Sequence, residues 1–314
     1  MKKSISLTFL LIFIFNALPA QEVFQRLSYP YEVRQVGLHD GEQMAFVDVG
    51  AGPEVLVFIH GEESYLPAWM KNIDELSREY RCIAVDLIGY GKSSKPMETN
   101  LLLDHSEYIA ELMDSLSIHR YNLIGHAMGG QIAIHHSLTY PNRVRKLVLI
   151  APTGIEKFEG AQSTMVKTLP SSSIINTTQE AIIAQIRNYF FQFPEEAGFM
   201  ITDRIAMAGD PQIDAYAYAV TGGIIGIIDQ PVSGLLGNIQ APTMVLIGAE
   251  DRVIPNSMYN PDLTQEMILE KVHQSMPNVE THLIPAGGHM VMFERYDVVN
   301  ALIRDFMIDS HLRR

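Results

Sequence analysis

Six apolar runs of strand length, separated by longer stretches, constrain most strongly what this chain can fold into. They occupy residues 55–59, 82–85, 121–124, 147–150, 244–247 and 281–284. Continuous apolar strands are typical of a parallel sheet covered by helices on both faces, because neither face of such a strand meets water. Two further strands are expected before them, at residues 31–36 and 44–49. The pattern predicts an α/β fold with a mostly parallel, doubly wound sheet.

A long interval between the fourth and fifth runs contains no strand pattern. Within residues 153–240, the segments 181–193 and 195–207 instead repeat Ile, Phe and Met with helical spacing. We expect this insertion to form a helical cap over the strand ends, with most of its Phe and Met side chains filling the cap's own core. The predicted organisation is a core of residues 21–152 and 241–314, interrupted by a cap of residues 153–240.

The first twenty residues have the order of a secretory signal peptide. Lys2 and Lys3 precede an apolar run at residues 7–15, and small residues end the segment at Ala20. The apolar run is too short to anchor the chain in a membrane. The segment predicts an exported protein, periplasmic or secreted. The single cysteine, Cys82, falls inside an apolar strand run, so we interpret it as core packing.

Charge and motifs limit the partners. The formal charge of −13 falls to −15 once Lys2 and Lys3 leave with the signal peptide, so neither nucleic acid nor an anionic membrane surface is an expected partner. The Gly91–Lys92–Ser93 sequence lacks the first glycine of a phosphate-binding loop. We expect no cofactor and no metal, and a small molecule as substrate or ligand. The sequence leaves the oligomeric state open.

Residues 122–130 read as the nucleophile turn of a hydrolase without its nucleophile. In the pattern G-x-S-x-G, a strand enters a sharp turn that exposes a serine, and a helix follows at once. Gly125 and Gly129 occupy the two glycine positions, and His126 precedes the central residue, which is Ala127. We interpret the two glycines as support for the turn. We interpret His126 in the same way, because the residue before this nucleophile usually points away from the pocket. A methyl group cannot attack a carbonyl carbon.

Three further segments fall where an open α/β sheet places its ligands, at the carboxyl ends of strands. Residues 58–64 resemble an oxyanion loop, in which the backbone N–H groups of Glu62 and of Met128 would stabilise a developing negative oxygen. Asp251 follows the fifth apolar run and is placed to orient a histidine, with Glu250 as a weaker substitute. The matching histidine is His289, after two glycines.

Taken in order, these segments resemble the α/β-hydrolase family, in particular its capped members related to esterases, lactonases and C–C bond hydrolases. The resemblance extends from about Tyr31 to the end of the chain, and residues 86–93 match the family's loop after the fourth strand. It implies the fold predicted above, with Asp251 and His289 as the acid and base of a catalytic triad.

The chain departs from that family at two places. Family members carry Ser, or Asp in dehalogenases and epoxide hydrolases, where this chain has Ala127. Alanine does not relieve the backbone strain of such a turn as glycine would, so a serine was either lost recently or replaced on purpose. The oxyanion loop also contains Glu62 and Glu63. An acid there repels an oxyanion unless it is protonated or turned away.

Three hypotheses follow from the sequence. The first is an exported hydrolase for a small ester, lactone or related carbonyl compound, in which His289 and Asp251 activate water and Glu62 acts as acid or base. The second is a binding or sensing protein that retains a hydrophobic small molecule without cleaving it. The third is a serine esterase silenced by Ala127.

Overall fold

The computed structural model describes residues 22–97, 101–156, 158, 160–168, 170–276 and 279–308. The predicted signal peptide of residues 1–20 therefore lies outside the described residues. Within them, no helix combines the length and the apolar character needed to cross a bilayer.

An eight-stranded sheet forms the centre of the described chain, in the order β1-β2-β4-β3-β5-β6-β7-β8. Strands β3 to β8 are parallel to one another, whereas β2 is antiparallel to both of its neighbours, β1 and β4. The predicted α/β fold with a mostly parallel sheet is confirmed. The strands are β1 Arg34–Gly37, β2 Gln43–Val49, β3 Val55–Ile59, β4 Arg81–Val85, β5 Tyr121–His126, β6 Val144–Ile150, β7 Thr243–Gly248 and β8 Val279–Ile284.

The first strand begins three residues later than predicted. β1 pairs only with β2, from Arg34 opposite Phe46 to Gly37 opposite Gln43. Tyr31 instead leaves the edge of the sheet, and its hydroxyl donates to the backbone carbonyl of Met70 over 3.0 Å. This tertiary contact overrides the apolar pattern at the start of the strand.

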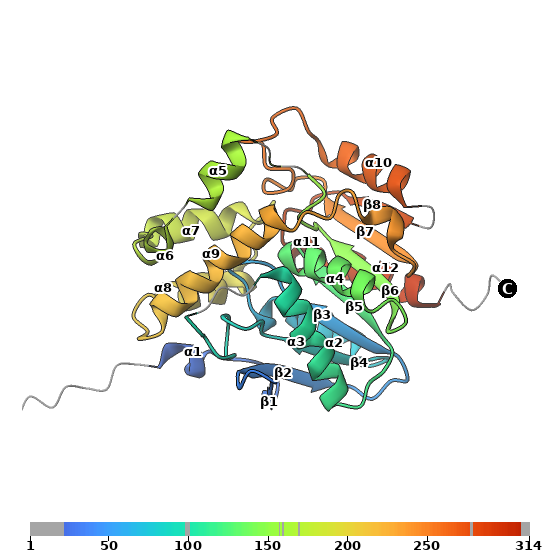
Figure 1. Cartoon of the computed structure of the whole chain (residues 1–314), viewed down its shortest axis with the longest axis horizontal. Coiled ribbons are helices and arrows are strands. Elements are labelled where there is room, and N and C mark those ends of the chain that lie inside the picture. The colour runs from blue at the N-terminus through green and yellow to red at the C-terminus, as the bar shows by residue number, and fades with distance from the viewer. Residues whose placement is uncertain are drawn as a thin grey trace, which may run out of the picture.

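Helices cover both faces of the sheet (Figure 1). Along β3, Val57 and Ile59 belong to one apolar cluster, and Leu56 and Phe58 belong to the other. This alternation is the period of two that a strand imposes on its side chains. The first cluster is covered by α3 Leu102–Ser115, α4 Met128–Thr139 and α10 Gln265–Ser275, and the second by α2 Met70–Leu76, α11 Val291–Glu294 and α12 Tyr296–Ile308.

Between β6 and β7, all the regular secondary structure of the described residues is helical. Figure 1 shows these helices gathered beyond one end of the sheet. We name these the inserted helices. They are α5 Ala161–Lys167, α6 Ser171–Ile175, α7 Gln179–Asn188, α8 Gly198–Met207 and α9 Ile213–Asp229, with short 3-10 turns η2 Glu195–Ala197 and η3 Leu236–Asn238. Helix α9 packs against α5 and α6 and also contacts α3 and α4, so it joins the insertion to the core.

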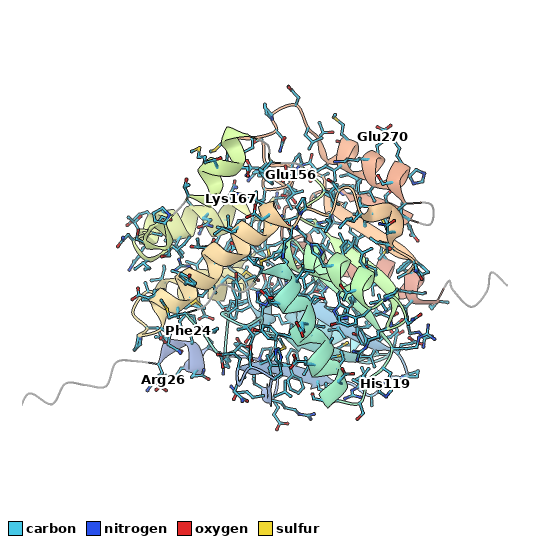
Figure 2. The ribbon with its side chains drawn as sticks, viewed as in Figure 1. Phe24, Arg26, His119, Glu156, Lys167 and Glu270 are labelled. Carbon is cyan, nitrogen blue, oxygen red and sulfur yellow. The ribbon has the colours of Figure 1, made fainter. Side chains whose placement is uncertain are left out.

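A short N-terminal helix, α1 Val23–Arg26, packs onto the inserted helices. Phe24, labelled in Figure 2, is fully buried, and its ring lies 5.5 Å from the ring of Tyr216 in α9. Its backbone N–H donates to the Asp210 carboxylate over 3.0 Å. The start of the described chain thus holds the insertion in place.

Candidate active site

A single residue forms the turn between β5 and α4. Ala127 has φ 48° and ψ −116°, in the left-handed range that favours glycine. A residue held there costs on the order of 1–3 kcal/mol of conformational energy. Its N–H donates to the Ile150 carbonyl over 2.9 Å, and its own carbonyl accepts from the N–H of Gly130 and of Thr153. A strand that enters a one-residue turn and leaves as a helix is the geometry of a nucleophile elbow.

The two flanking glycines are required by space. A Cβ on Gly125 would lie 2.3 Å from the Gly129 carbonyl oxygen, and a Cβ on Gly129 would lie 2.3 Å from the Ile59 carbonyl oxygen. Real side chains do not approach backbone this closely. The helix can therefore pack directly onto β3 and β5 only with glycine at both positions.

The loop after β3 runs alongside this turn. His60 holds the loop, because its Nδ1 donates to the Gly61 carbonyl over 2.7 Å while its Nε2 accepts from the Leu87 N–H over 3.0 Å. Burial lowers the pKa of His60 to about 4, so the ring is neutral. A Cβ on Gly61 would lie 3.1 Å from the Ala127 Cβ. The loop thus passes beside the turn, where an oxyanion loop belongs.

The two expected oxyanion donors border the same cavity. Glu62 lies in the loop, and Met128 is the first residue of α4. The N–H of a first helical residue has no acceptor within its own helix, and the positive end of the helix dipole favours negative charge. The arrangement can therefore stabilise a negative oxygen beside Ala127.

His289 and Asp251 are brought together from separate loops. The Nδ1 of His289 donates to Asp251 Oδ2 over 2.9 Å. The other oxygen, Oδ1, accepts from the backbone N–H groups of Val253 and Ile254 at 2.8 and 3.0 Å. With its proton on Nδ1, the ring keeps a lone pair on Nε2 and can act as a base. Asp251 is fully buried, so these donors fix both its position and that of the imidazole.

Glu250, which the sequence offers as a weaker substitute for Asp251, holds two loops together instead. Its carboxylate accepts from the Gly287 N–H over 3.1 Å, and its own N–H donates to the Gly287 carbonyl over 3.0 Å. Glu250 therefore ties the end of β7 to the loop that carries His289, and it does not contact the imidazole.

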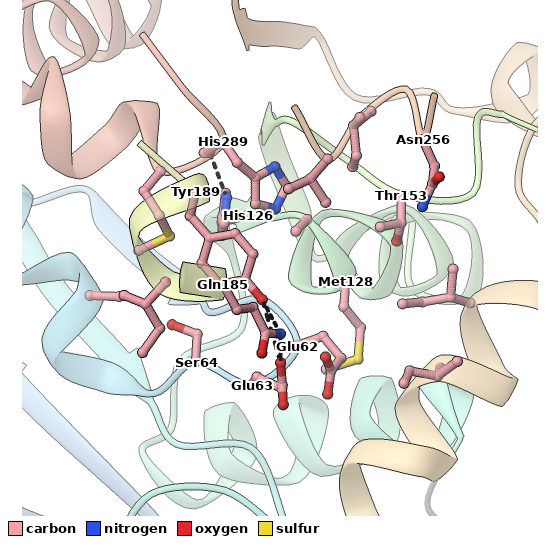
Figure 3. Close-up of a pocket in the computed structure, with 18 of the residues that line it drawn as sticks. Glu62, Glu63, Ser64, His126, Met128, Thr153, Gln185, Tyr189, Asn256 and His289 are labelled. Carbon is pink, nitrogen blue, oxygen red and sulfur yellow. Dashed lines mark hydrogen bonds between the residues drawn. The ribbon is translucent and has the colours of Figure 1, made fainter. Parts of the chain in front are cut away.

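His126 was expected to point away from the pocket, and this expectation is wrong. The ring borders the cavity and lies 4.7 Å from the ring of His289. Its Nε2 donates to the His289 backbone carbonyl over 2.9 Å, which turns the side chain toward the histidine loop (Figure 3). Burial, together with the nearby His289, lowers the pKa of His126 well below 6.5, so it is neutral. Its interpretation as support for the turn agrees with these contacts.

Glu294 is a supporting residue that the sequence did not reveal. Its carboxylate accepts from the N–H groups of Gly288, Phe191 and Gln192 at 2.8, 3.1 and 2.6 Å. It thereby clamps the loop before His289 to the chain that leaves α7. The same chain turns back at Tyr189, whose carbonyl accepts from the Met290 N–H, and α7 ends at Asn188 rather than reaching residue 193 as predicted.

A cavity of about 360 Å³ lies between these loops and the inserted helices. His289, Ala127, His126, Met128 and Glu62 all line it. Its remaining wall is mostly apolar and comes largely from the inserted helices, among them Ile186, Met200, Met207, Ile224 and Ile227. A volume of this size encloses a small organic molecule.

With the geometry described, comparison with known proteins identifies the family. The family model described as alpha/beta hydrolase fold matches residues 54–296, which run from β3 into α12 and include the inserted helices. The chain belongs to the α/β-hydrolase fold family.

Curated relatives of this chain include a hydrolase and an acetyltransferase component. It is 27% identical over 269 residues to a 2-hydroxy-6-oxononadienedioate/2-hydroxy-6-oxononatrienedioate hydrolase of Paraburkholderia phymatum, covering 83% of this chain and 89% of that protein. It is also similar to the dihydrolipoyllysine-residue acetyltransferase component of the acetoin cleaving system of Cupriavidus necator. There the identity is 24% over 274 residues, and the match covers 84% of this chain but 66% of that protein.

Solved structures share the fold of this α/β-hydrolase along most of its length. A probable hydrolytic enzyme from Pseudomonas aeruginosa PAO1 superposes with a TM-score of 0.78 at 23% identity, covering 89% of this chain and 95% of that one. A meta-cleavage product hydrolase from Pseudomonas fluorescens IP01 gives a TM-score of 0.69 at 21% identity, covering 88% and 98%. At these identities the likeness shows the fold.

The loop after β3 places two carboxyl groups, those of Glu62 and Glu63, at the cavity. Burial, reinforced by the charge of Glu63, raises the pKa of Glu62 well above its usual range, which favours its protonated form. Glu63 accepts hydrogen bonds from Gln185 and, over 3.4 Å, from the Tyr189 hydroxyl (Figure 3). The raised pKa of Glu62 therefore weakens the repulsion that an ionised carboxylate would exert on an oxyanion.

Two further charged groups line the cavity of this α/β-hydrolase without any signal in the sequence. Glu156, labelled in Figure 2, accepts from the Asn256 N–H and from Asn260 Nδ2, each at 3.0 Å, and burial raises its pKa. Arg204 reaches the cavity from α8. Both lie in or beside the inserted segment, where side-chain direction depends on packing that spacing alone does not reveal.

One group with metal-ligand spacing was found among the described residues, and it lies outside the cavity. His39, Glu107 and Glu111 have ligand atoms within 4.8 Å of one another, on the turn after β1 and on α3. His39 and Glu107 are exposed, and the His39 Nδ1 is already hydrogen bonded to Glu111. Exposed acidic groups of this kind are common without a metal, so the cluster indicates no metal site.

Proposed function

We propose that the cavity is a hydrolase-type site for a small ester, lactone or related carbonyl compound. The observation that carries the proposal is the hydrogen bond from His289 Nδ1 to the buried Asp251, 2.9 Å long, at a cavity that also contains the nucleophile turn. This pair leaves Nε2 as a base. Because residue 127 offers no nucleophile, the base can activate only water.

The remaining parts of an acyl-transfer site support this proposal. Backbone N–H groups at Glu62 and Met128 border the cavity where an oxyanion would form. A protonated Glu62 can also donate a proton to a leaving oxygen. A site that lacks one triad member can retain an acceleration of about 10³ to 10⁴ over water from the oxyanion hole and binding alone. We therefore propose slow hydrolysis rather than efficient turnover.

The relatives suggest which carbonyl compounds to test. One relative is a hydrolase of 2-hydroxy-6-oxononadienedioate, a compound with carboxylate groups and a ketone. The apolar wall of this cavity supports uncharged esters and lactones as substrates, whereas the carboxyl groups of Glu62, Glu63 and Glu156 oppose a dianion. The first panel is accordingly one of neutral acyl esters and lactones, with a dienedioate as comparison.

The test is turnover by the unaltered chain and by His289→Ala on that panel. We expect slow product formation that His289→Ala abolishes, without a burst and without labelling by a fluorophosphonate, because no serine is acylated. Glu62→Gln tests the acid role, and an unchanged rate would remove Glu62 from the mechanism. Product formation that persists in His289→Ala would rule out the proposed base.

A second candidate is a protein that binds a hydrophobic small molecule without cleaving it. Ala127 itself favours this function, since a cavity of about 360 Å³ can hold a ligand that the site cannot attack. Thermal-shift measurements separate the two candidates, because a binding protein is stabilised and releases its ligand unchanged. A third possibility, a serine esterase silenced by Ala127, differs from the first only in its lack of turnover. We further propose that the protein acts outside the cytoplasm, on the basis of the leader pattern at residues 1–20.

A further inference from the structure

Glu63 occupies a backbone position that disfavours its side chain. Its φ is 51°, in the left-handed region that glycine adopts without cost. A non-glycine residue there costs roughly 1–2 kcal/mol. The carboxylate nevertheless borders the cavity, where Gln185 and Tyr189 hold it. Strain of this kind persists where the side chain has a use that glycine could not serve.

Glu62 contributes a polar atom without a partner. Among the described residues its Oε1 is buried and has no hydrogen-bond partner. A buried polar atom left unpaired costs about 1–3 kcal/mol, so a native structure has a reason to keep one. Figure 3 shows the carboxyl groups of Glu62 and Glu63 pointing away from His289 in the close-up of the cavity. The two residues form an acidic end of the cavity, which we name the acidic pair.

Arg204 brings positive charge to the cavity. Among the described residues that line it, Arg204 is the only Lys or Arg, against Glu62, Glu63 and Glu156. The guanidinium of Arg204 lies 5.4 Å from the centre of the Tyr216 ring, and it donates to the Ile174 carbonyl over 3.1 Å. Part of its donor capacity is therefore used outside the cavity, and the acidic pair is not neutralised by a salt bridge within 4.0 Å in the described structure.

We propose that the acidic pair binds the ammonium group of an amphiphilic ligand or substrate, whose apolar part lies along the Met and Ile side chains of the inserted helices. An ammonium group has three N–H donors and a positive charge, which complement the acceptor oxygens and the negative charge of carboxylates. The formal charge of −13 also attracts cations toward the molecule. The inference deepens the proposed function and rests on it for the location of the site, but its test needs no turnover.

Binding of a cation at this position has a consequence for protons. Burial raises the pKa of Glu62 well above its usual range, and an adjacent ammonium favours its ionised form. Where the Glu62 carboxyl carries a proton, binding therefore releases it to solvent, and affinity rises with pH. The titratable and charged groups whose charges act on Glu62 or on the carboxyl beside it are Glu63, Tyr90, Tyr189, Arg204 and Tyr216.

Three probes with one chain and different head groups test the proposal: n-octylamine, n-octanol and n-octanoate. Titration calorimetry at about pH 8 with the full folded chain should give at least about tenfold tighter binding of the amine than of the carboxylate, with the alcohol between them. Repeating the amine titration in phosphate and in Tris, whose ionisation enthalpies differ, should reveal proton release on binding.

Matched variants locate the effect. Glu62→Gln should remove the proton release and reduce the preference for the amine, and Glu63→Gln should reduce the same preference. Glu156→Gln changes another cavity acid, held by Asn256 and Asn260, and should leave the preference intact. Circular dichroism establishes that each variant is folded, and the comparison of head groups on the unaltered chain stands even if a variant is not.

Equal or tighter binding of octanoate by the unaltered chain would overturn the proposal and point to Arg204 as the ligand's partner. A preference for the amine that survives in both Glu62→Gln and Glu63→Gln would overturn it as well. Failure of the hydrolysis assay leaves these titrations unaffected, whereas slow hydrolysis of neutral esters without any preference for the amine would contradict only the ammonium site.

Discussion

His126 donates a hydrogen bond from Nε2 to the backbone carbonyl of His289 over 2.9 Å, although 163 positions separate the two residues. The residue immediately before Ala127 thus holds the loop that carries the base. The two rings lie 4.7 Å apart. The contacts that hold the loop of His289 against the turn are therefore in place with alanine at position 127.

Buried neutral histidines should make stability depend on pH. The pKa of His60 is about 4 in the folded chain and about 6.5 when unfolded. Below about pH 6.5 the unfolded chain binds a proton that the folded chain does not, so the stabilising contribution of His60 is lost as the pH falls toward 4. The full effect is about 3 kcal/mol.

Buried carboxyl groups titrate in a similar pH range. The contribution of His60 is therefore measured as the difference in unfolding free energy between the unaltered chain and His60→Gln. Urea unfolding of the unaltered chain and of His60→Gln should show that the cost of the substitution is largest near pH 7 and shrinks near pH 5. A cost that grows as the pH falls would contradict a neutral buried His60.

Ala127→Gly should stabilise the protein. Glycine adopts φ 48° without the strain of an alanine, which is on the order of 1–3 kcal/mol. The greater conformational freedom of glycine in the unfolded chain opposes this gain by about 0.5–1 kcal/mol. We expect a net gain of about 1 kcal/mol in the free energy of unfolding by urea. Ala127→Val is the matched control and should destabilise, since a β-branched residue is still less suited to this backbone. A loss of stability in Ala127→Gly would show that the turn is not strained.

Much of the fold follows from the sequence because burial on both faces leaves a simple pattern. The six apolar runs became β3 to β8. The residues of the site lie at strand ends, which are recognisable by position.

Side-chain direction within loops and inserted helices was not predictable in the same way. His126 turns toward His289 because it finds a backbone acceptor there, contrary to expectation. Glu156, Arg204 and Glu294 reach their places through contacts between segments far apart in the chain. No spacing rule encodes such contacts, since they exist only once the inserted helices are packed on the core.

Glu294→Gln should loosen the histidine loop. Three N–H groups point at the Glu294 carboxylate, and replacing one oxygen by an amide leaves a donor facing donors. We expect a loss of about 1–3 kcal/mol in the free energy of unfolding. Glu250→Gln is the control, because its carboxylate accepts one such bond, from Gly287, and the loss should be smaller. Equal losses would mean that Glu294 is not the main clamp.

Asp251→Asn, made in an Ala127→Ser background, should remove most of any activity that the serine restores. The amide of asparagine can present an N–H donor to His289 Nδ1, which favours the wrong tautomer of the ring. In a triad this change lowers kcat by a factor of about 10⁴. The surface substitution Asp262→Asn in the same background should leave the rate unchanged. If Asp251→Asn retained the rate of its parent, another group would have to orient His289.

The most direct measurement compares ester hydrolysis by the unaltered chain and by Ala127→Ser, side by side, on short and bulky acyl esters. His289, which is hydrogen bonded to Asp251, lines the same cavity as Ala127, Glu62 and Met128. If these residues have the proposed roles, the added hydroxyl should raise kcat/KM by at least about 10³-fold and make the protein reactive toward a fluorophosphonate. The unaltered chain should stay slow and unlabelled. A folded Ala127→Ser protein that is neither faster nor labelled would contradict the account.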